Sequence, residues 1–233
     1  TAYAGKENGF RTVGIIRGDE LADKWEQNLT LALAKANGMQ FKFVSRANYR
    51  QKENSEFLKE LESEFGNYYL LPEGGTNALA IKGCGEILNP DDDDFDIVSC
   101  AVGTGGTIAG IIDSSNASQY ILGFPALKGD FLKKDICKFA QKRNWELQTD
   151  YHFGGYAKVD EKLVNFINDF KQKTGIPLDP IYTGKHLYGI LDLVGKDYFS
   201  PNTKILAIHT GGLQGIIGMN LILKMKNLPL LDL

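Results

Sequence analysis

Short runs rich in β-branched and aromatic residues alternate with longer helix-forming stretches along the whole chain. This order is typical of βαβ units, whose strands lie parallel in an open sheet. The sequence therefore predicts an α/β protein built on open parallel sheets. We expect strands over residues 12–18, 39–45, 67–75, 95–103, 120–127, 177–184 and 204–212. We expect the helices over residues 21–38, 55–66, 77–88, 106–115, 131–143, 185–194 and 214–224.

Both halves of the 233-residue chain show this alternation, so we expect two α/β domains. The predicted boundary lies at the turn PEGGT, which gives a smaller domain over residues 1–74 and a larger one over residues 75–233. The first residues, TAYAGKENG, are typical of the second half of a helix that stops at Gly9. We therefore expect a preceding segment that would complete the larger domain.

Charge and composition exclude several classes of protein. The formal net charge is −3, without the basic excess that attracts nucleic acid, so no nucleic-acid partner is expected. The sequence has no uninterrupted apolar run of membrane-spanning length, and its first residues lack a signal-peptide core. Its three cysteines are widely spaced, as reduced thiols of the cytosol usually are. We expect a cytoplasmic protein without a membrane partner.

Some polar features are best interpreted as structural. The acidic run Asp91–Asp94 lacks the glycine and the terminal glutamate of a calcium-binding loop, which favours a solvated turn. His152, His186 and His209 have no metal-ligand spacing, and no metal is expected. Residues 161–175 form an amphipathic pattern with a glycine stop, and its apolar face should pack in the core.

Three turns between predicted strands and helices carry glycine doublets: PEGGT at 72–76, GTGGT at 103–107 and HTGGLQG at 209–215. Ligands of open parallel sheets lie at this edge, beyond the carboxyl ends of the strands. In GTGGT the backbone N–H groups can converge at a helix start, where the dipole also favours an anion. Thr104 and Thr107 add hydroxyl groups, so Gly103, Thr104, Gly105, Gly106 and Thr107 together predict a phosphate site.

The GTGGT turn differs from the common nucleotide motifs. It lacks the Gly-Lys-Ser/Thr ending of a Walker loop, and Ile108 breaks the G-x-G-x-x-G dinucleotide pattern. The next predicted strand, YILGFPAL, ends without the acidic residue that would hold a ribose. These differences favour a compact phosphate-bearing cofactor.

The GTGGT turn, with YTGK at 182–185 and HTGG at 209–212 downstream, resembles the pyridoxal-phosphate enzymes of the tryptophan synthase β-like fold, fold type II. The sequence is most similar to the branch of D-cysteine desulfhydrase and 1-aminocyclopropane-1-carboxylate deaminase, over essentially the whole chain. The resemblance implies pyridoxal 5'-phosphate held by residues 103–107 of the larger domain, a small amino-acid substrate and a homodimer. It also implies that Tyr156 and Tyr182 face the substrate and the cofactor ring. Lys185 is the last residue of the YTGK motif, and a surface lysine at a helix start is at least as good an interpretation of it as a ligand-binding residue.

Two positions separate the activities within this branch. The deaminases resembled here have a glutamate after the second tyrosine and typically a leucine before the last glycine pair, whereas the desulfhydrases have small hydroxyl residues. This chain has Thr183 and Thr210. A carboxylate beside the pyridine nitrogen strengthens the electron sink that cyclopropane opening needs, and a threonine cannot do so. The resemblance therefore implies β-elimination from D-cysteine, giving pyruvate, ammonia and hydrogen sulfide. The alternative substrates are 1-aminocyclopropane-1-carboxylate and D-serine.

Catalysis in this family needs a lysine that bonds to the cofactor and moves the Cα proton. It lies in a Gly-Asn-Lys-like motif near the N-terminus of the family's members, and this sequence has no such motif. Lys6 belongs to a later segment and is not assigned the role. We expect the lysine in the preceding segment. The alternative is a non-catalytic relative that binds the cofactor or phosphate.

Overall fold

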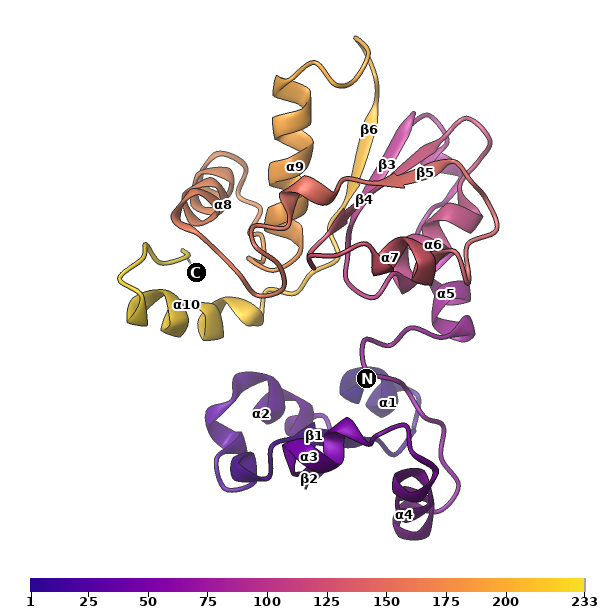
Figure 1. Ribbon diagram of the computed structural model, residues 1–233, viewed down its shortest axis with the longest axis vertical. Helices are drawn as coiled ribbons and strands as arrows, with labels where there is room; N and C mark the ends of the chain where they lie inside the picture. The colour runs from indigo at the N-terminus through magenta and orange to yellow at the C-terminus, as the bar shows by residue number, and fades with distance from the viewer. Residues whose placement is uncertain (233) are drawn as a thin grey trace. The chain divides into compact units, whose positions relative to one another are not determined.

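The computed structural model describes residues 1–232 and divides the chain into two compact units, Thr1–Leu70 and from Leu71 onward (Figure 1). The prediction of α/β architecture with parallel sheets is confirmed in both units. That the second unit binds a cofactor remains a prediction.

The first unit has a parallel two-stranded sheet, in which β1 pairs with β2 from Val13↔Gln40 to Arg17↔Val44. Its small core contains Val44, Phe57 and Leu61. The elements are α1 (Ala2–Glu7), β1 (Val13–Arg17), η1 (Asp19–Leu21), η2 (Trp25–Gln27), α2 (Leu29–Ala36), β2 (Gln40–Val44), α3 (Arg46–Arg50) and α4 (Ser55–Phe65).

The second unit is built on a four-stranded parallel sheet in the order β5-β4-β3-β6. Its strands are β3 (Ile97–Val102), β4 (Tyr120–Pro125), β5 (Trp145–Leu147) and β6 (Ile205–Ile208). Its α-helices are α5 (Ala78–Cys84), α6 (Gly106–Ser114), α7 (Phe131–Ile136), α8 (Glu161–Thr174), α9 (Thr183–Gly195) and α10 (Gly215–Met225). Two 3-10 helices, η3 (Pro90–Asp92) and η4 (Thr149–Tyr151), lie in the connections.

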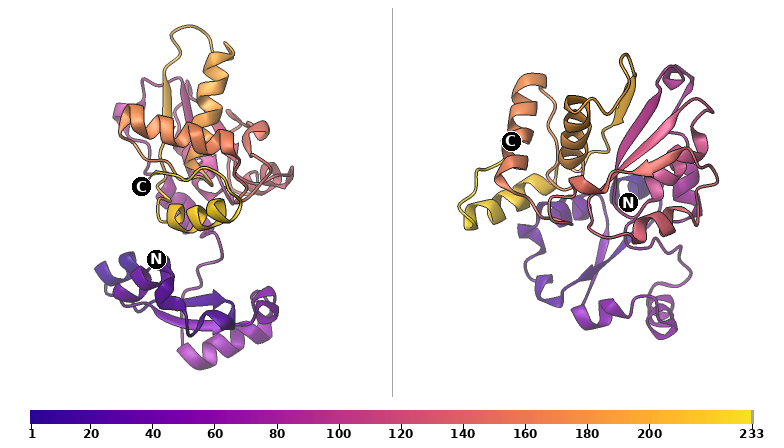
Figure 2. Two further views of the ribbon diagram at one scale, coloured as in Figure 1. Left: turned by 90° about the vertical axis from the view of Figure 1, so that its left-hand side faces the viewer. Right: turned by 45° about the horizontal axis from the view of Figure 1, so that its top comes forward.

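Helices cover both faces of this sheet, as Figures 1 and 2 show. Successive strand residues point to opposite faces, so β3 packs Val98 and Cys100 into one cluster with α5, α6 and α7. On the other face, Phe124 of β4 packs with Ile190 and Leu193 of α9. Because both faces are buried, β3 is apolar along nearly its whole length.

The structure corrects three of the predicted elements. Residues 67–75 and 177–184 form no strand. Pro72 lies inside the first range and Pro180 inside the second, where proline cannot donate to a sheet ladder, whereas Pro125 of β4 is only the last residue of its strand. The helix predicted over 21–38 is shorter, since the Asn28 side chain accepts the amides of Thr30 and Leu31 and starts α2 there. The three-residue strand β5 was not predicted.

The amphipathic helix over 161–175 is confirmed as α8, which ends at Gly175 with φ of +74°. Leu163 and Ile167 are buried, and Phe166 and Phe170 pack against the same cluster. The predicted core role of this helix face is therefore correct.

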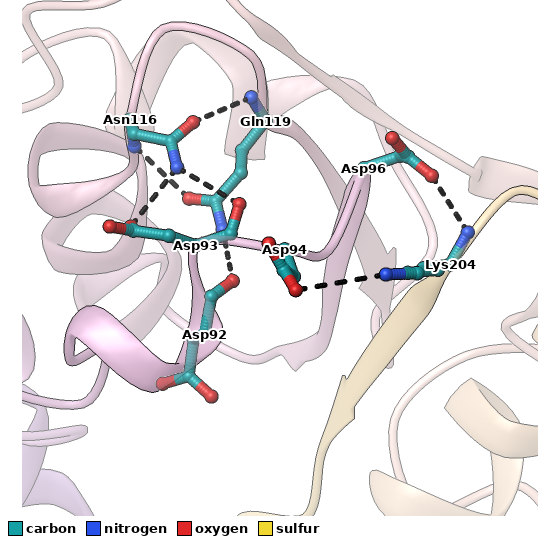
Figure 3. A network of polar contacts seen from close by, with 7 residues as sticks. All are labelled: Asp92, Asp93, Asp94, Asp96, Asn116, Gln119 and Lys204. Carbon is teal, nitrogen blue, oxygen red and sulfur yellow. Dashed lines mark hydrogen bonds and ion pairs between the residues drawn. The ribbon is translucent and has the colours of Figure 1, made fainter.

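Figure 3 shows the polar contacts of the acidic run at the amino end of the sheet. Asn116 Nδ2 donates to Asp93 Oδ1 at 3.1 Å, and Gln119 Nε2 donates to a backbone carbonyl of the run at 2.8 Å. Nearby, Asp96 Oδ2 accepts the backbone N–H of Lys204 at 2.8 Å. These bonds link the start of β3 to the starts of β4 and β6.

Within residues 1–232, no helix is long and apolar enough to cross a membrane.

Candidate active site

The predicted phosphate turn connects the carboxyl end of β3 to α6. Gly105 is the residue before the helix and has φ of +91°, and a Cβ there would lie 2.8 Å from Ile136 Cγ1. Only glycine fits both conditions without strain. No side chain caps α6, and the amides of Gly105, Gly106 and Thr107 have no bonding partner among the described residues. Free amides at a helix start fit a bound phosphate.

The first glycine turn, PEGGT, lies against this phosphate turn. The hydroxyl oxygens of Thr76 and Thr104 are 2.6 Å apart, at hydrogen-bonding distance. A Cβ at Gly74 would lie 2.5 Å from Thr104 Cγ2, and one at Gly106 would lie 2.8 Å from Thr76 Oγ1. The missing side chains therefore allow two backbone segments to approach closely and place both hydroxyls beside the free amides.

Tyr182 and Tyr156 lie together beside the phosphate turn. A Cβ at Gly103 would lie 3.2 Å from the Tyr182 ring, so this glycine lets the tyrosine reach the end of β3. The two tyrosine rings meet edge to face with centroids 6.2 Å apart. Burial, and then the neighbouring Tyr156 hydroxyl, raise the pKa of Tyr182. Tyr182 therefore keeps its proton at neutral pH and can donate a hydrogen bond.

The start of α9 is organised by the buried carboxylate of Asp179. Its Oδ1 accepts the amides of Ile181 and Tyr182, each at 2.8 Å. Its Oδ2 accepts both the amide and the hydroxyl of Thr183, each at 2.7 Å. The Thr183 oxygen in turn accepts the Asp179 amide at 2.8 Å. Four donors thus fix the backbone that carries Tyr182.

Thr183 is fully buried, and its hydroxyl proton is already donated to Asp179. One lone pair of the Thr183 oxygen accepts the Asp179 amide, so only its second lone pair remains available, and only to accept a hydrogen bond. Thr210 is exposed on the third glycine turn. That turn also approaches Asp179, since a Cβ at Gly212 would lie 3.2 Å from its Cγ. The roles of both threonines beside a ring nitrogen stay predictions.

Lys185 is buried, with 1% of its surface exposed, and is not a surface lysine. Its Nζ donates to the carbonyl oxygens of His152 at 2.9 Å and Gly155 at 2.8 Å. Burial lowers the pKa of Lys185 to about 8, although the carboxylates of Asp179 and Asp160 act in the opposite direction. The ammonium therefore holds the backbone immediately before Tyr156.

His186 and Ser99 form a buried polar pair between α9 and β3. The Nε2 of His186 lies 2.9 Å from Ser99 Oγ, whereas its Nδ1 has no partner. Burial, and then the neighbouring His209, lower the pKa of His186 to about 3. The imidazole therefore stays neutral in the folded protein. This agrees with the structural role expected of a histidine without metal-ligand spacing.

The structure thus brings together a defined set of the predicted residues. Gly103, Thr104, Gly105, Gly106 and Thr107 form the turn, and Tyr182 with Tyr156 borders it. Sequence reasoning missed Asp179, although the pair Asp179-Pro180 is a recognisable turn signal, in which the aspartate accepts an amide two residues on. It also missed the contact of Thr76 with Thr104, for which the sequence carries no signal.

The site fits a phosphate-bearing group of limited size. It offers unbonded amides, two threonine hydroxyls and a backbone cleared of side chains by glycine. The aromatic pair Tyr156–Tyr182 borders the turn at Gly103. Among the described residues, no group of three or more His, Cys, Asp or Glu side chains is placed to hold a metal ion.

No family model matches this sequence. A Pyrococcus abyssi protein provisionally named 1-aminocyclopropane-1-carboxylate deaminase is 31% identical over 239 residues, which cover 93% of this chain and 70% of that protein. The Arabidopsis thaliana mitochondrial protein named bifunctional D-cysteine desulfhydrase/1-aminocyclopropane-1-carboxylate deaminase is 34% identical over 181 residues, 68% of this chain and 45% of that protein.

The fold agrees with these relationships. The crystal structure described as an ACC deaminase homologue superposes with a TM-score of 0.74 at 28% identity, covering 91% of this chain and 69% of that one. Similarity therefore extends through both units of the chain, in sequence and in structure. The chain belongs to the family of 1-aminocyclopropane-1-carboxylate deaminases and D-cysteine desulfhydrases, with the fold of the fold type II pyridoxal-phosphate enzymes.

Proposed function

We propose that this protein is a pyridoxal-phosphate-dependent lyase that acts on D-cysteine. The overall reaction would consume D-cysteine and water and release pyruvate, ammonia and hydrogen sulfide. The observation that carries the proposal is the uncapped start of α6 with its free amides, in a turn whose first residue, Gly103, lies against the Tyr182 ring. The cofactor supplies, when bound, an electron sink for loss of the Cα proton and of the leaving group.

The residues of this chain would bind and orient. The amides of residues 105–107 and the hydroxyls of Thr104 and Thr107 would hold the phosphate. Tyr182 keeps its proton and would donate to a polar atom of the cofactor or the substrate, while the exposed Tyr156 would face the substrate. The acceptor of the Cα proton would be the lysine that the family's chemistry requires.

The choice of D-cysteine rests on the neutral residues Thr183 and Thr210. A threonine carries no charge that could pair with a protonated ring nitrogen. The electron sink would therefore be weaker than one supported by a carboxylate. Loss of hydrosulfide demands less of the sink than opening of a cyclopropane. The Asp179 carboxylate does not replace the missing acid, because its two oxygens are occupied by four donors.

Two measurements test this proposal on the protein expressed from its complete gene. Turnover of D-cysteine, 1-aminocyclopropane-1-carboxylate and D-serine should be compared side by side, with hydrogen sulfide and ammonia as readouts. D-cysteine should be the fastest substrate. Faster cyclopropane opening would assign the protein to the alternative deaminase activity, which the name of the Pyrococcus protein favours.

Cofactor binding is measured separately, by the absorbance of bound pyridoxal phosphate. Thr107→Val should raise the dissociation constant about tenfold, as expected for one hydrogen bond to a charged group. The matched control is Thr203→Val, because Thr203 bonds only to Ser200 in the turn before β6, at the amino end of the strand. Equal affinities of both variants would refute the phosphate assignment.

The proposal extends to the setting of the enzyme. We propose a homodimer in the cytoplasm, in line with the family resemblance and with three cysteines that are free thiols. Light scattering should give twice the mass of one chain. A protein that binds the cofactor but forms no borohydride-stable bond to any lysine would instead be the non-catalytic relative.

A further inference from the structure

The segment that presents Tyr156 has an unusual backbone. Phe153, Gly154, Gly155 and Ala157 all have positive φ, at 52°, 89°, 115° and 54°. Phe153 and Ala157 carry side chains, for which this region is unfavourable. Such a backbone persists only where its surroundings determine it strongly. The residues 152–157, called here the tyrosine loop, must therefore be held by specific contacts.

Backbone turns provide part of this restraint. The Gly155 amide donates to the His152 carbonyl at 3.0 Å, and the Lys158 amide donates to the Gly155 carbonyl at 3.1 Å. The Gly154 amide donates to His152 Nδ1 at 2.9 Å. These three bonds join residues within 152–158, so they do not attach the loop to the rest of the unit.

The bonds from Lys185 come from outside the loop. Its Nζ donates to the same two carbonyls, those of His152 and Gly155, and so ties both turns to α9. A buried ammonium is costly to place in a protein, and its pKa is correspondingly lowered. An apolar residue could fill this position more easily if packing were the only requirement.

The position of Lys185 in α9 connects this contact with the candidate site. Tyr182 precedes it by three residues, so one helical turn places a ring beside Gly103 and an ammonium group under the tyrosine loop. Tyr156, the next residue after Gly155, is 54% exposed and touches the unit's interior through the Tyr182 ring.

We infer that Lys185 is a positioning residue, which fixes the tyrosine loop to α9 and so sets Tyr156 beside Tyr182. The consequence for turnover rests on the proposed function, whereas the effect on loop order does not. The bonded, buried ammonium is also unsuited to react with the cofactor itself. Both its burial and its two carbonyl acceptors keep it directed into the loop.

Hydrogen exchange tests the inference without substrate. Lys185→Met keeps an unbranched side chain, one heavy atom shorter than lysine, and removes both hydrogen bonds. The amides of Gly154, Gly155 and Lys158 should exchange at least tenfold faster in this variant, while the α6 and β3 amides keep their rates. Lys185→Arg, which keeps donors at the end of the chain, should restore part of the protection. Unchanged loop exchange in Lys185→Met would overturn the inference.

A matched control separates loop order from stability. Val98→Ala trims a buried residue near the start of β3, at the end of the strand opposite the tyrosine loop. In Val98→Ala the faster exchange should be spread over the amides of the β3 core. The amides of the tyrosine loop should be accelerated no more than the general loss of stability explains. If Lys185→Met shows the same spread pattern as Val98→Ala, Lys185 is merely a stabilising residue and the inference fails.

Kinetics and chemistry supply the remaining readouts in the cofactor-loaded protein. Lys185→Met and Tyr156→Phe should each lower kcat/KM at least tenfold, and the double variant should lose little more than either one, because both changes act through Tyr156. Borohydride reduction and peptide mapping should place the cofactor on a lysine other than Lys185. A cofactor bonded to Lys185 would overturn the positioning role. Loop exchange that changes as expected in a protein that turns over none of the proposed substrates would refute the proposed function alone.

Discussion

Replacement of His186 by glutamine should flatten the dependence of stability on pH. In the folded protein, burial lowers the pKa of His186 to about 3, from the ordinary histidine value of 6.5. The unfolded chain therefore binds a proton on this group at pH 5 that the folded chain does not bind. Stability from the neutral imidazole is complete above pH 6.5 and is lost as the pH falls toward 3.

The magnitude follows from these two pKa values. Linkage gives a loss of about 2 kcal/mol in the free energy of unfolding between pH 7 and pH 5, with a slope near 1.4 kcal/mol per pH unit below pH 6. His186 is fully buried, so solvent does not screen the effect. Nδ1 of His186 has no hydrogen-bond partner, so no acceptor is in place for the second N–H group that the imidazolium would carry.

Urea denaturation followed by far-ultraviolet circular dichroism measures the effect at both pH values. The glutamine amide can still bond to Ser99 but does not titrate, so His186→Gln serves as the reference. Its lower stability from altered packing is the same at both pH values and cancels in the difference. The wild-type protein should lose about 2 kcal/mol more than the variant between pH 7 and pH 5. Equal losses would refute the reasoning, because carboxylates with a lowered pKa, such as Asp192, contribute alike to both proteins.

Three further changes test the geometry of the candidate site. Gly105→Ala should lower the free energy of unfolding by about 1–3 kcal/mol, because φ is +91° and the new Cβ would lie 2.8 Å from Ile136 Cγ1. An unchanged melting temperature would contradict this. Thr76→Val removes a hydroxyl 2.6 Å from Thr104 and should cost about 1 kcal/mol by urea denaturation, with weaker binding of pyridoxal phosphate in a titration. Asp179→Asn exchanges one carboxylate oxygen for an NH₂ group that cannot accept, and should cost about 2 kcal/mol; stability equal to wild type would contradict the four-donor arrangement.

The sequence predicts the architecture where its pattern is strong. An apolar run, then glycines, then a helical pattern predicted a strand-to-helix connection at residues 103–107. The structure has this connection, between β3 and α6. The three residues of β5 carry too little periodicity to be recognised. Residues 67–75 have strand-like composition, but Pro72 and the glycines after it favour an irregular segment.

The candidate site was harder to predict because its contacts join distant parts of the chain. The burial of Lys185 depends on two carbonyls about thirty residues earlier, in a loop whose positive φ values no composition rule indicates. The hydrogen bonds between Asp179 and Thr183 are local, and the turn signal Asp179-Pro180 could have indicated them. The proximity of Tyr156 and Tyr182 was expected only through the family resemblance.

The buried amine of Lys185 would have a consequence if the protein binds an aldehyde cofactor, as proposed above. With a pKa of about 8, part of this amine is uncharged near neutral pH, and uncharged amines attack aldehydes readily. Enclosure between α9 and the tyrosine loop separates it from any aldehyde in solution or in the site. The fold thus shields one reactive nitrogen, so that a carbonyl cofactor of the proposed kind would not be captured at the wrong place.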